Sequence, residues 1–196
     1  LTKIFNVARF ASQFDAPDDL ERPPEDLAPE DRWILAEFDH VMTRVEDAWS
    51  RIDIYTAAQA IKGFGTGVFP SHWLEMTKSR LYDGNVAAAW TLHRVVRDLL
   101  RALTPICPFF THYLSTTLYG HSAVDARSFP RLPTGAVGED ADALKALTPA
   151  VSDFNSAVWK LKKESGLSLK SPISNISIPS ELSMLEDSLV RMHSIE

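Results

Sequence analysis

The chain has 196 residues, of which 45% are hydrophobic and 23% are charged, so it can bury a sizeable core beneath a polar surface. Its single cysteine, Cys107, excludes an internal disulfide and is typical of a reducing compartment, so we expect a cytoplasmic protein. The net charge of −6 excludes a uniformly basic surface, and no apolar run is long enough to cross a membrane, so we expect no membrane partner.

The charge is unevenly distributed along the chain. Half of the acidic residues, 13 of 26, lie between Asp15 and Asp53, whereas the segment from Met76 to Arg131 is rich in bases. The bases of that segment are Lys78, Arg80, Arg94, Arg97, Arg101, Arg127 and Arg131, against the acids Asp83, Asp98 and Asp125. One face could therefore be basic although the whole chain is acidic.

Helical periodicity dominates the first 120 residues. Residues 1–14 predict an amphipathic helix, and an acidic, proline-bearing connector follows. A second helix is predicted from Pro29 to about residue 50, because proline suits a first helical turn. A third runs from Ile54 to Tyr82, weakened or kinked by the glycines and proline of "GFGTGVFP". Two more cover residues 86–104 and a segment that Gly120 ends, so residues 1–120 predict an antiparallel helix bundle.

The rest of the chain predicts a linker over residues 121–138 and a C-terminal unit over 139–196. A long helix is expected from Glu139 to Gly166, with a coiled-coil-like seam. The seam residues are Leu144, Leu147, Val151, Phe154, Val158 and Leu161. "NISIP" has β character and "SELSMLEDSLVRMH" predicts a short helix, so we expect a small α/β appendage. The predicted fold class is mainly α.

The segment "EMTKSRLY" is similar to the Lys-Met-Ser-Lys-Ser loop that holds ATP phosphates in class I aminoacyl-tRNA synthetases. Such a loop needs a nucleotide-binding parallel sheet and a His-x-Gly-His partner, and the sequence predicts neither. We therefore expect a helix here and no ATP site, which disfavours a free-standing ATP enzyme. The six histidines have no metal-ligand spacing, so we expect no metal site.

Four segments, in order, resemble the anticodon-binding domain of class Ia aminoacyl-tRNA synthetases. They are "LTKIFNVARFA", "DRWIL", "HWLEMTKSRLY" and "ALTPICPFFTHYLSTTLYG", with His112 where the family often has an acid. The tail "FNSAVWKLKKESGLSLKSPI" looks most like valyl-tRNA synthetases, particularly the archaeal type.

The resemblance implies a non-catalytic module of a valine–tRNA ligase, excised from a longer protein. Its expected partners are tRNA(Val) and the remainder of the parent synthetase. No cofactor is expected in this fragment, whereas the parent would use ATP with magnesium. The alternatives are the same domain of an isoleucyl or leucyl enzyme, and a helical protein-interaction module that uses the acidic connector and the seam.

Unpaired anticodon bases are read by stacking and hydrogen bonds, with basic side chains on the phosphates. The resemblance places Arg9 and Phe10 near the anticodon, and Lys3 and Asn6 share their side of the first helix. The other candidate RNA contacts are Arg94, Arg97, Arg101, Lys160, Lys162 and Lys163.

Each candidate has a structural alternative. Phe10 could pack on a neighbouring helix and Arg9 could pair with Asp15. Arg94 could pair with Asp98 four residues on, and the lysines could form a solvated face. Arg80 is expected to anchor the bundle through Glu75 or Asp83 rather than to contact RNA.

Overall fold

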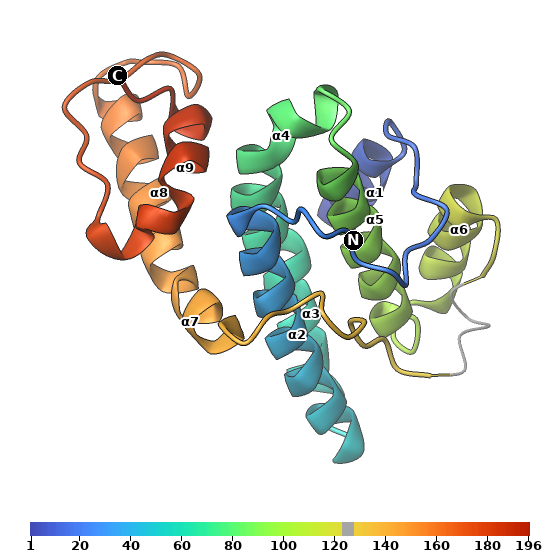
Figure 1. Ribbon diagram of the computed structural model, residues 1–196. Helices are drawn as coiled ribbons and strands as arrows, with labels where there is room; N and C mark the ends of the chain where they lie inside the picture. The colour runs from blue at the N-terminus through green and yellow to red at the C-terminus, as the bar shows by residue number, and fades with distance from the viewer. Residues whose placement is uncertain (123–127) are drawn as a thin grey trace.

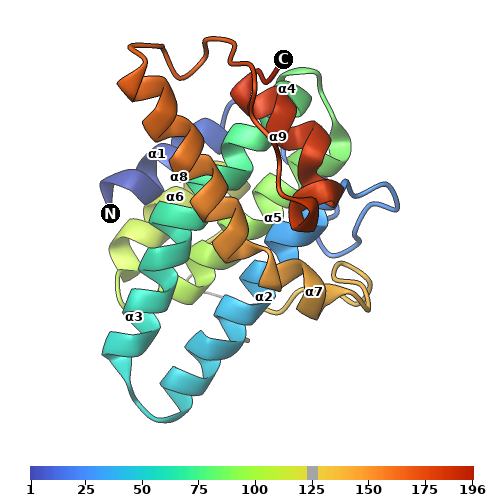
Figure 2. The same cartoon turned by 90° about the vertical axis from the view of Figure 1, so that its left-hand side faces the viewer.

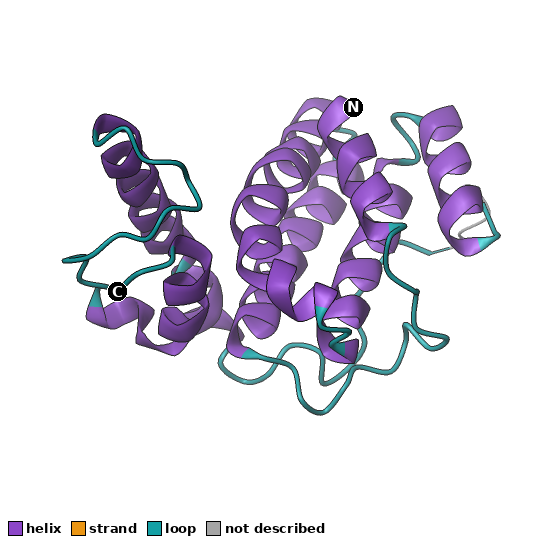
Figure 3. Ribbon diagram, turned by 90° about the horizontal axis from the view of Figure 1, so that it is seen from above, coloured by secondary structure: helices purple, strands orange, loops and turns teal. Residues whose placement is uncertain are grey.

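A computed structural model describes residues 1–122 and 128–196, so Asp125 and Arg127 of the basic segment lie outside the described residues. The described chain consists of helices and loops (Figure 1, Figure 3). The prediction of a mainly α fold is confirmed.

The bundle is built by the five predicted helical runs. Helix α1 spans Thr2–Ala11, α2 spans Pro29–Ser50, α5 spans Val86–Leu103 and α6 spans Pro108–Tyr119. Between α2 and α5 lies one continuous run made of α3 (Ile54–Gly63), η1 (Phe64–Trp73) and α4 (Leu74–Tyr82). The side chains of Asp53 and Asn85 accept hydrogen bonds from the first turns of α3 and α5, which fixes where these helices begin.

The segment that the sequence marks as weak is a π-helix, η1, inside the long run. Wider π turns accommodate Pro70 without ending the helix, and they are often found at functional sites. Gly65 lets η1 approach α5 closely, because a Cβ at this position would lie 2.9 Å from Cδ2 of Leu99. The predicted interruption is therefore a change of helical pitch rather than a break.

The core of the bundle contains a column of aromatic rings from α2 and η1. The ring centroids of Phe38 and Phe64 are 5.2 Å apart, those of Phe64 and Phe69 5.7 Å, and those of Phe69 and Trp73 5.1 Å. All four side chains are buried. Burial of such large rings stabilises the packing of α2 on the α3–α4 run.

The C-terminal unit contains α7 (Ala141–Ala146), α8 (Thr148–Glu164), the 3-10 helix η3 (Ser180–Leu185) and α9 (Glu186–His193). The prediction of a single long helix from Glu139 is wrong in one respect, because the chain turns at Leu147 and a new helix begins at Thr148, with Pro149 in its first turn. The expected β character is reduced to one isolated parallel bridge between Ile173 and Ile195.

The seam of α8 also shifts register at its C-terminal end. Val151, Phe154 and Val158 are buried as predicted, but Leu161 is 41% exposed while the neighbouring Lys162 is fully buried. Helical periodicity alone predicts that Leu161 is buried and that Lys162 is exposed. The lysine is inside because three backbone carbonyls receive its ammonium group.

The C-terminal unit lies across the face made by α2 and the α3–α4 run (Figure 2). A polar bridge crosses this interface: Nδ2 of Asn155 lies 2.8 Å from Nδ1 of His72, and Oδ1 of Asn155 lies 2.7 Å from Nε2 of His193. Burial lowers the pKa of both histidines, that of His193 to about 4, so both are neutral at physiological pH. Asn155 can then donate to one ring and accept from the other.

Candidate nucleic-acid interface

Helix α1 presents a polar face to solvent. Ile4, Val7, Ala8 and Ala11 are buried against the bundle. Because these positions occupy one side of the helix, Lys3, Asn6 and Arg9 point away from the core and are exposed. Within the described chain the Arg9 guanidinium has no ion pair, so the alternative pairing with Asp15 is not formed there.

A cleft of about 310 Å³ separates α1 from η1 and α4. Lys3, Asn6 and Phe10 form its α1 wall, and the opposite wall includes Ser71 and the ion pair of Lys78 with Glu75, whose Nζ and Oε1 atoms are 2.5 Å apart. Nζ of Lys3 donates a hydrogen bond of 3.2 Å to the backbone carbonyl of Thr66, which holds the lysine across the cleft mouth. The cleft therefore combines cationic, amide and aromatic groups, which is the chemistry that reads an unpaired base and its phosphate.

Phe10 belongs to an aromatic cluster at one end of this cleft. Its ring centroid lies 5.1 Å from that of Phe14 and 6.4 Å from that of Tyr82, both in edge-to-face geometry. Phe10 is only partly buried and Tyr82 is 65% exposed. Phe10 thus packs on neighbouring rings, as in the structural alternative, while part of its own ring surface remains accessible to solvent.

Two side chains near the cleft, Lys78 and Tyr82, were not among the predicted RNA contacts. Both belong to the segment "HWLEMTKSRLY", where a lysine and a tyrosine four residues apart lie on one side of a helix. That four-residue spacing is the feature of the sequence from which the two side chains could have been predicted to lie together. What the sequence did not reveal is that this side of α4 faces the same region as α1.

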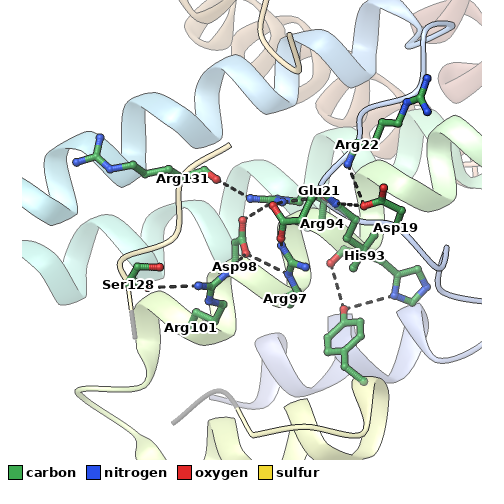
Figure 4. Close-up of polar contacts among 12 residues, drawn as sticks. Asp19, Glu21, Arg22, His93, Arg94, Arg97, Asp98, Arg101, Ser128 and Arg131 are labelled. Atoms are coloured by element: carbon green, nitrogen blue, oxygen red, sulfur yellow. Dashed lines mark hydrogen bonds and ion pairs between the residues drawn. The ribbon is translucent and has the colours of Figure 1, made fainter. Parts of the chain in front are cut away.

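The three arginines of α5 have mostly structural surroundings (Figure 4). Arg94 is 1% exposed and pairs through Nε with the buried carboxylate of Asp98 at 2.8 Å. It also donates to the backbone carbonyls of Leu20 and Arg131 and to Glu21. Arg94 is therefore not accessible for the predicted RNA contact, because its donors are used inside the protein.

Arg97 and Arg101 join the same network. Both guanidinium groups lie 3.3 Å from Oδ1 of Asp98, and Arg97 also pairs with Glu21 at 2.7 Å. Although partial burial opposes ionisation of Glu21, Arg94 and Arg97 lower its pKa below the usual value. The network attaches the acidic connector and residues 128–131 to α5, so it positions loops rather than displaying a basic stripe.

A second buried network surrounds Arg80. Its guanidinium donates to Glu30 at 2.9 Å, to Asp31 at 2.7 Å and to Asn85 at 3.0 Å. The anchoring role predicted for Arg80 is present, but the prediction of its partners was wrong: they are acids of the first turn of α2 and not Glu75 or Asp83. Burial raises the pKa of Asp31 even though Arg80 opposes the shift.

The lysines at the end of α8 fall into two groups. Lys160 and Lys163 are exposed, whereas the ammonium group of Lys162 is enclosed and donates to three backbone carbonyls. The ammonium group of Lys162 is therefore not accessible for the predicted direct RNA contact. Lys160 and Lys163 remain available.

Over residues 1–122 and 128–196 no cluster of histidine, cysteine, aspartate or glutamate side chains is arranged to hold a metal ion. In the same part of the chain, no helix combines the length and apolar character needed to cross a membrane.

The bundle thus carries a cleft lined by lysine, asparagine and phenylalanine side chains, groups that are able to contact an unpaired base and its phosphate. Residues 31–177 match the anticodon-binding domain of tRNA ligases, and the chain belongs to that family. The match begins after α1.

The curated relatives match a larger share of the chain than the family model does. The chain is 34% identical over 192 residues to a valine–tRNA ligase of Pyrobaculum aerophilum, which covers 94% of this chain and 23% of the relative. It is 32% identical over 202 residues to that of Aeropyrum pernix, covering 98% and 24%. For Methanothrix thermoacetophila the values are 33% over 186 residues, 93% and 20%. The chain thus spans about a quarter or less of the length of these relatives.

Proposed function

We propose that this chain is the part of a valine–tRNA ligase that receives the anticodon loop of tRNA(Val). The observation that carries the proposal is the cleft between α1 and the η1–α4 run, in which Lys3, Asn6 and Phe10 of α1 form one wall, with the exposed Arg9 on the same helix. The consistent naming of the relatives supports valine over isoleucine or leucine as the amino acid of the parent enzyme.

In the proposed mechanism the domain acts by position. An unpaired base enters beside Phe10, the amide of Asn6 and the guanidinium of Arg9 offer hydrogen bonds to base edges, and Lys3 lies close enough for a phosphate. The buried networks around Arg80 and Arg94 hold the walls and loops in place, so a matching tRNA is bound with little reorganisation. Aminoacylation, with ATP and magnesium, belongs to the catalytic part of the parent enzyme.

We also propose that residues 1–120 form the RNA-reading bundle, that 121–138 connect it to a C-terminal unit of residues 139–196, and that the parent is cytoplasmic. The protein-interaction alternative is less well supported. The seam predicted to bind a partner protein is largely covered by the rest of this chain. Its buried residues are Leu144, Val151, Phe154 and Val158.

The proposal is tested by titrating labelled tRNA(Val), and the same tRNA with a substituted anticodon, into the chain. We expect Arg9→Ala to reduce the ratio of the two affinities by roughly ten- to a hundredfold, the worth of one base-reading arginine. Arg44→Ala is the matched control, because Arg44 is an exposed arginine on α2 away from the cleft. An unchanged ratio in the Arg9→Ala protein would contradict the proposed reading of the anticodon by this face of α1.

A further inference from the structure

The end of α8 and the loop after it form the most basic short segment of the chain. Residues 160–170 contain Lys160, Lys162, Lys163 and Lys170 against a single acid, Glu164. This lies in a protein whose net charge is −6. Like charges at such density repel one another, so the segment is suited to a polyanionic ligand.

The buried Lys162 organises this segment. Its Nζ donates to the carbonyls of Leu169 at 2.9 Å, Ser171 at 2.8 Å and His193 at 2.7 Å. The first two carbonyls flank Lys170, so the backbone on both sides of Lys170 is tied to α8. No carboxylate of the described residues pairs with Lys162, and its charge therefore adds to the positive potential.

Lys160, Lys163 and Lys170 surround this anchor and are exposed. The ion pair of Lys160 with Glu164 is long, 3.9 Å, and both side chains are mostly exposed, so it neutralises little of the charge. The negative end of the α8 dipole accounts for lysines in the last helical turn. It does not account for a buried lysine that fixes the loop carrying Lys170.

The basic segment and the cleft lie on the same side of the molecule. Helix α8 packs against η1, which forms part of the cleft wall. Figure 2 shows the C-terminal end of α8 on the side where α1 lies, and both helices contact η1. A ligand that reaches both places must be extended and anionic along its length, as an RNA strand or stem is.

We infer that Lys160, Lys163 and Lys170 form a second RNA contact that binds backbone phosphates of the stem next to the anticodon loop, without reading sequence. The inference rests on the proposed function for the identity of the RNA. Phosphate contacts position a nucleic acid and add affinity, whereas base contacts discriminate. In this inference the lysine surface adds affinity, and the cleft provides the specificity for the anticodon.

The test compares Lys160→Gln/Lys163→Gln/Lys170→Gln with a matched triple variant, Arg44→Gln/Arg51→Gln/Lys145→Gln, that removes the same charge elsewhere. The probes are tRNA(Val), the tRNA with a substituted anticodon, and a blunt RNA duplex without a loop, each titrated over a series of KCl concentrations. Circular dichroism confirms that both variants are folded.

We expect the lysine variant to lose affinity for all three RNAs by the same factor, with the slope of log K against log salt reduced by about 2 to 3. The control variant should retain affinity. The inference is overturned if the unmodified chain does not bind the duplex, or if the lysine variant binds it with unchanged affinity and slope. Loss of duplex binding without any anticodon discrimination in the unmodified chain would support this surface while refuting the proposed cleft function.

Discussion

Replacing Arg80 with methionine should strongly destabilise the fold. The arginine is the cationic partner of Asp31, which is fully buried, and of Glu30, which is 3% exposed. After the substitution, the donors that Asp31 keeps within the described part of the chain are neutral: Nε1 of Trp73 and the backbone N–H of Ala28. Methionine fills much of the vacated volume, so the main loss is electrostatic.

The expected cost at about pH 7.5 is about 3 to 5 kcal/mol in the free energy of unfolding, the usual result of leaving one charge of a buried pair uncompensated. For a chain of this length, this corresponds to a fall of roughly 6 to 20 °C in Tm. Burial already raises the pKa of Asp31, and removal of Arg80 raises it further. A carboxyl group whose pKa is higher in the folded state destabilises the fold when ionised, so the cost should shrink as the pH falls.

Urea unfolding followed by tryptophan fluorescence, for the unmodified and variant chains at several pH values, measures this difference directly. The double variant Arg80→Met/Asp31→Asn should recover much of the loss, because it removes the unpaired charge. Arg44→Met, at an exposed position, is the control and should change little. A cost below about 1 kcal/mol, typical of an exposed ion pair, would refute the reasoning, as would a cost that grows on acidification.

Two further effects on stability should be measurable by the same assay. Because His193 has a pKa of about 4 in the folded state and about 6.5 when unfolded, lowering the pH from about 7.5 to about 5 should cost about 2 kcal/mol through this residue alone. His72 acts in the same direction, and His193→Gln should show a smaller pH dependence; equal dependence in the two proteins would exclude this origin. Gly84→Ala should cost about 1 kcal/mol because Gly84 has φ +75°, whereas Gly63→Ala, in a right-handed conformation with no atom within 4 Å of the added Cβ, should stabilise by about 0.5 to 1 kcal/mol; a stabilising Gly84→Ala would contradict the backbone argument.

The helices and their ends follow closely from local sequence signals. Pro29 begins α2, Asn85 caps α5 and Gly120, with φ +71°, ends α6. These signals act over one helical turn, so they can be interpreted without knowledge of the neighbours. The break at Leu147 was missed because the apolar periodicity continues through it, although Pro149 was a visible signal.

The sequence by itself therefore determined the mainly helical fold, the order of its elements and the family resemblance, because periodicity, caps and ordered motifs are local properties. Only the tertiary structure decided which cations can contact a ligand. The sequence offers Arg94 and Lys162 as possible surface bases, but both side chains are buried. Arg94 donates to the backbone carbonyls of residues 20 and 131, and Lys162 donates to that of residue 193. Lys3, Asn6 and Phe10 meet Lys78 across a cleft only because α1 packs beside a helix more than sixty positions later in the chain. Exposure and proximity depend on contacts between distant segments, and no local pattern encodes them.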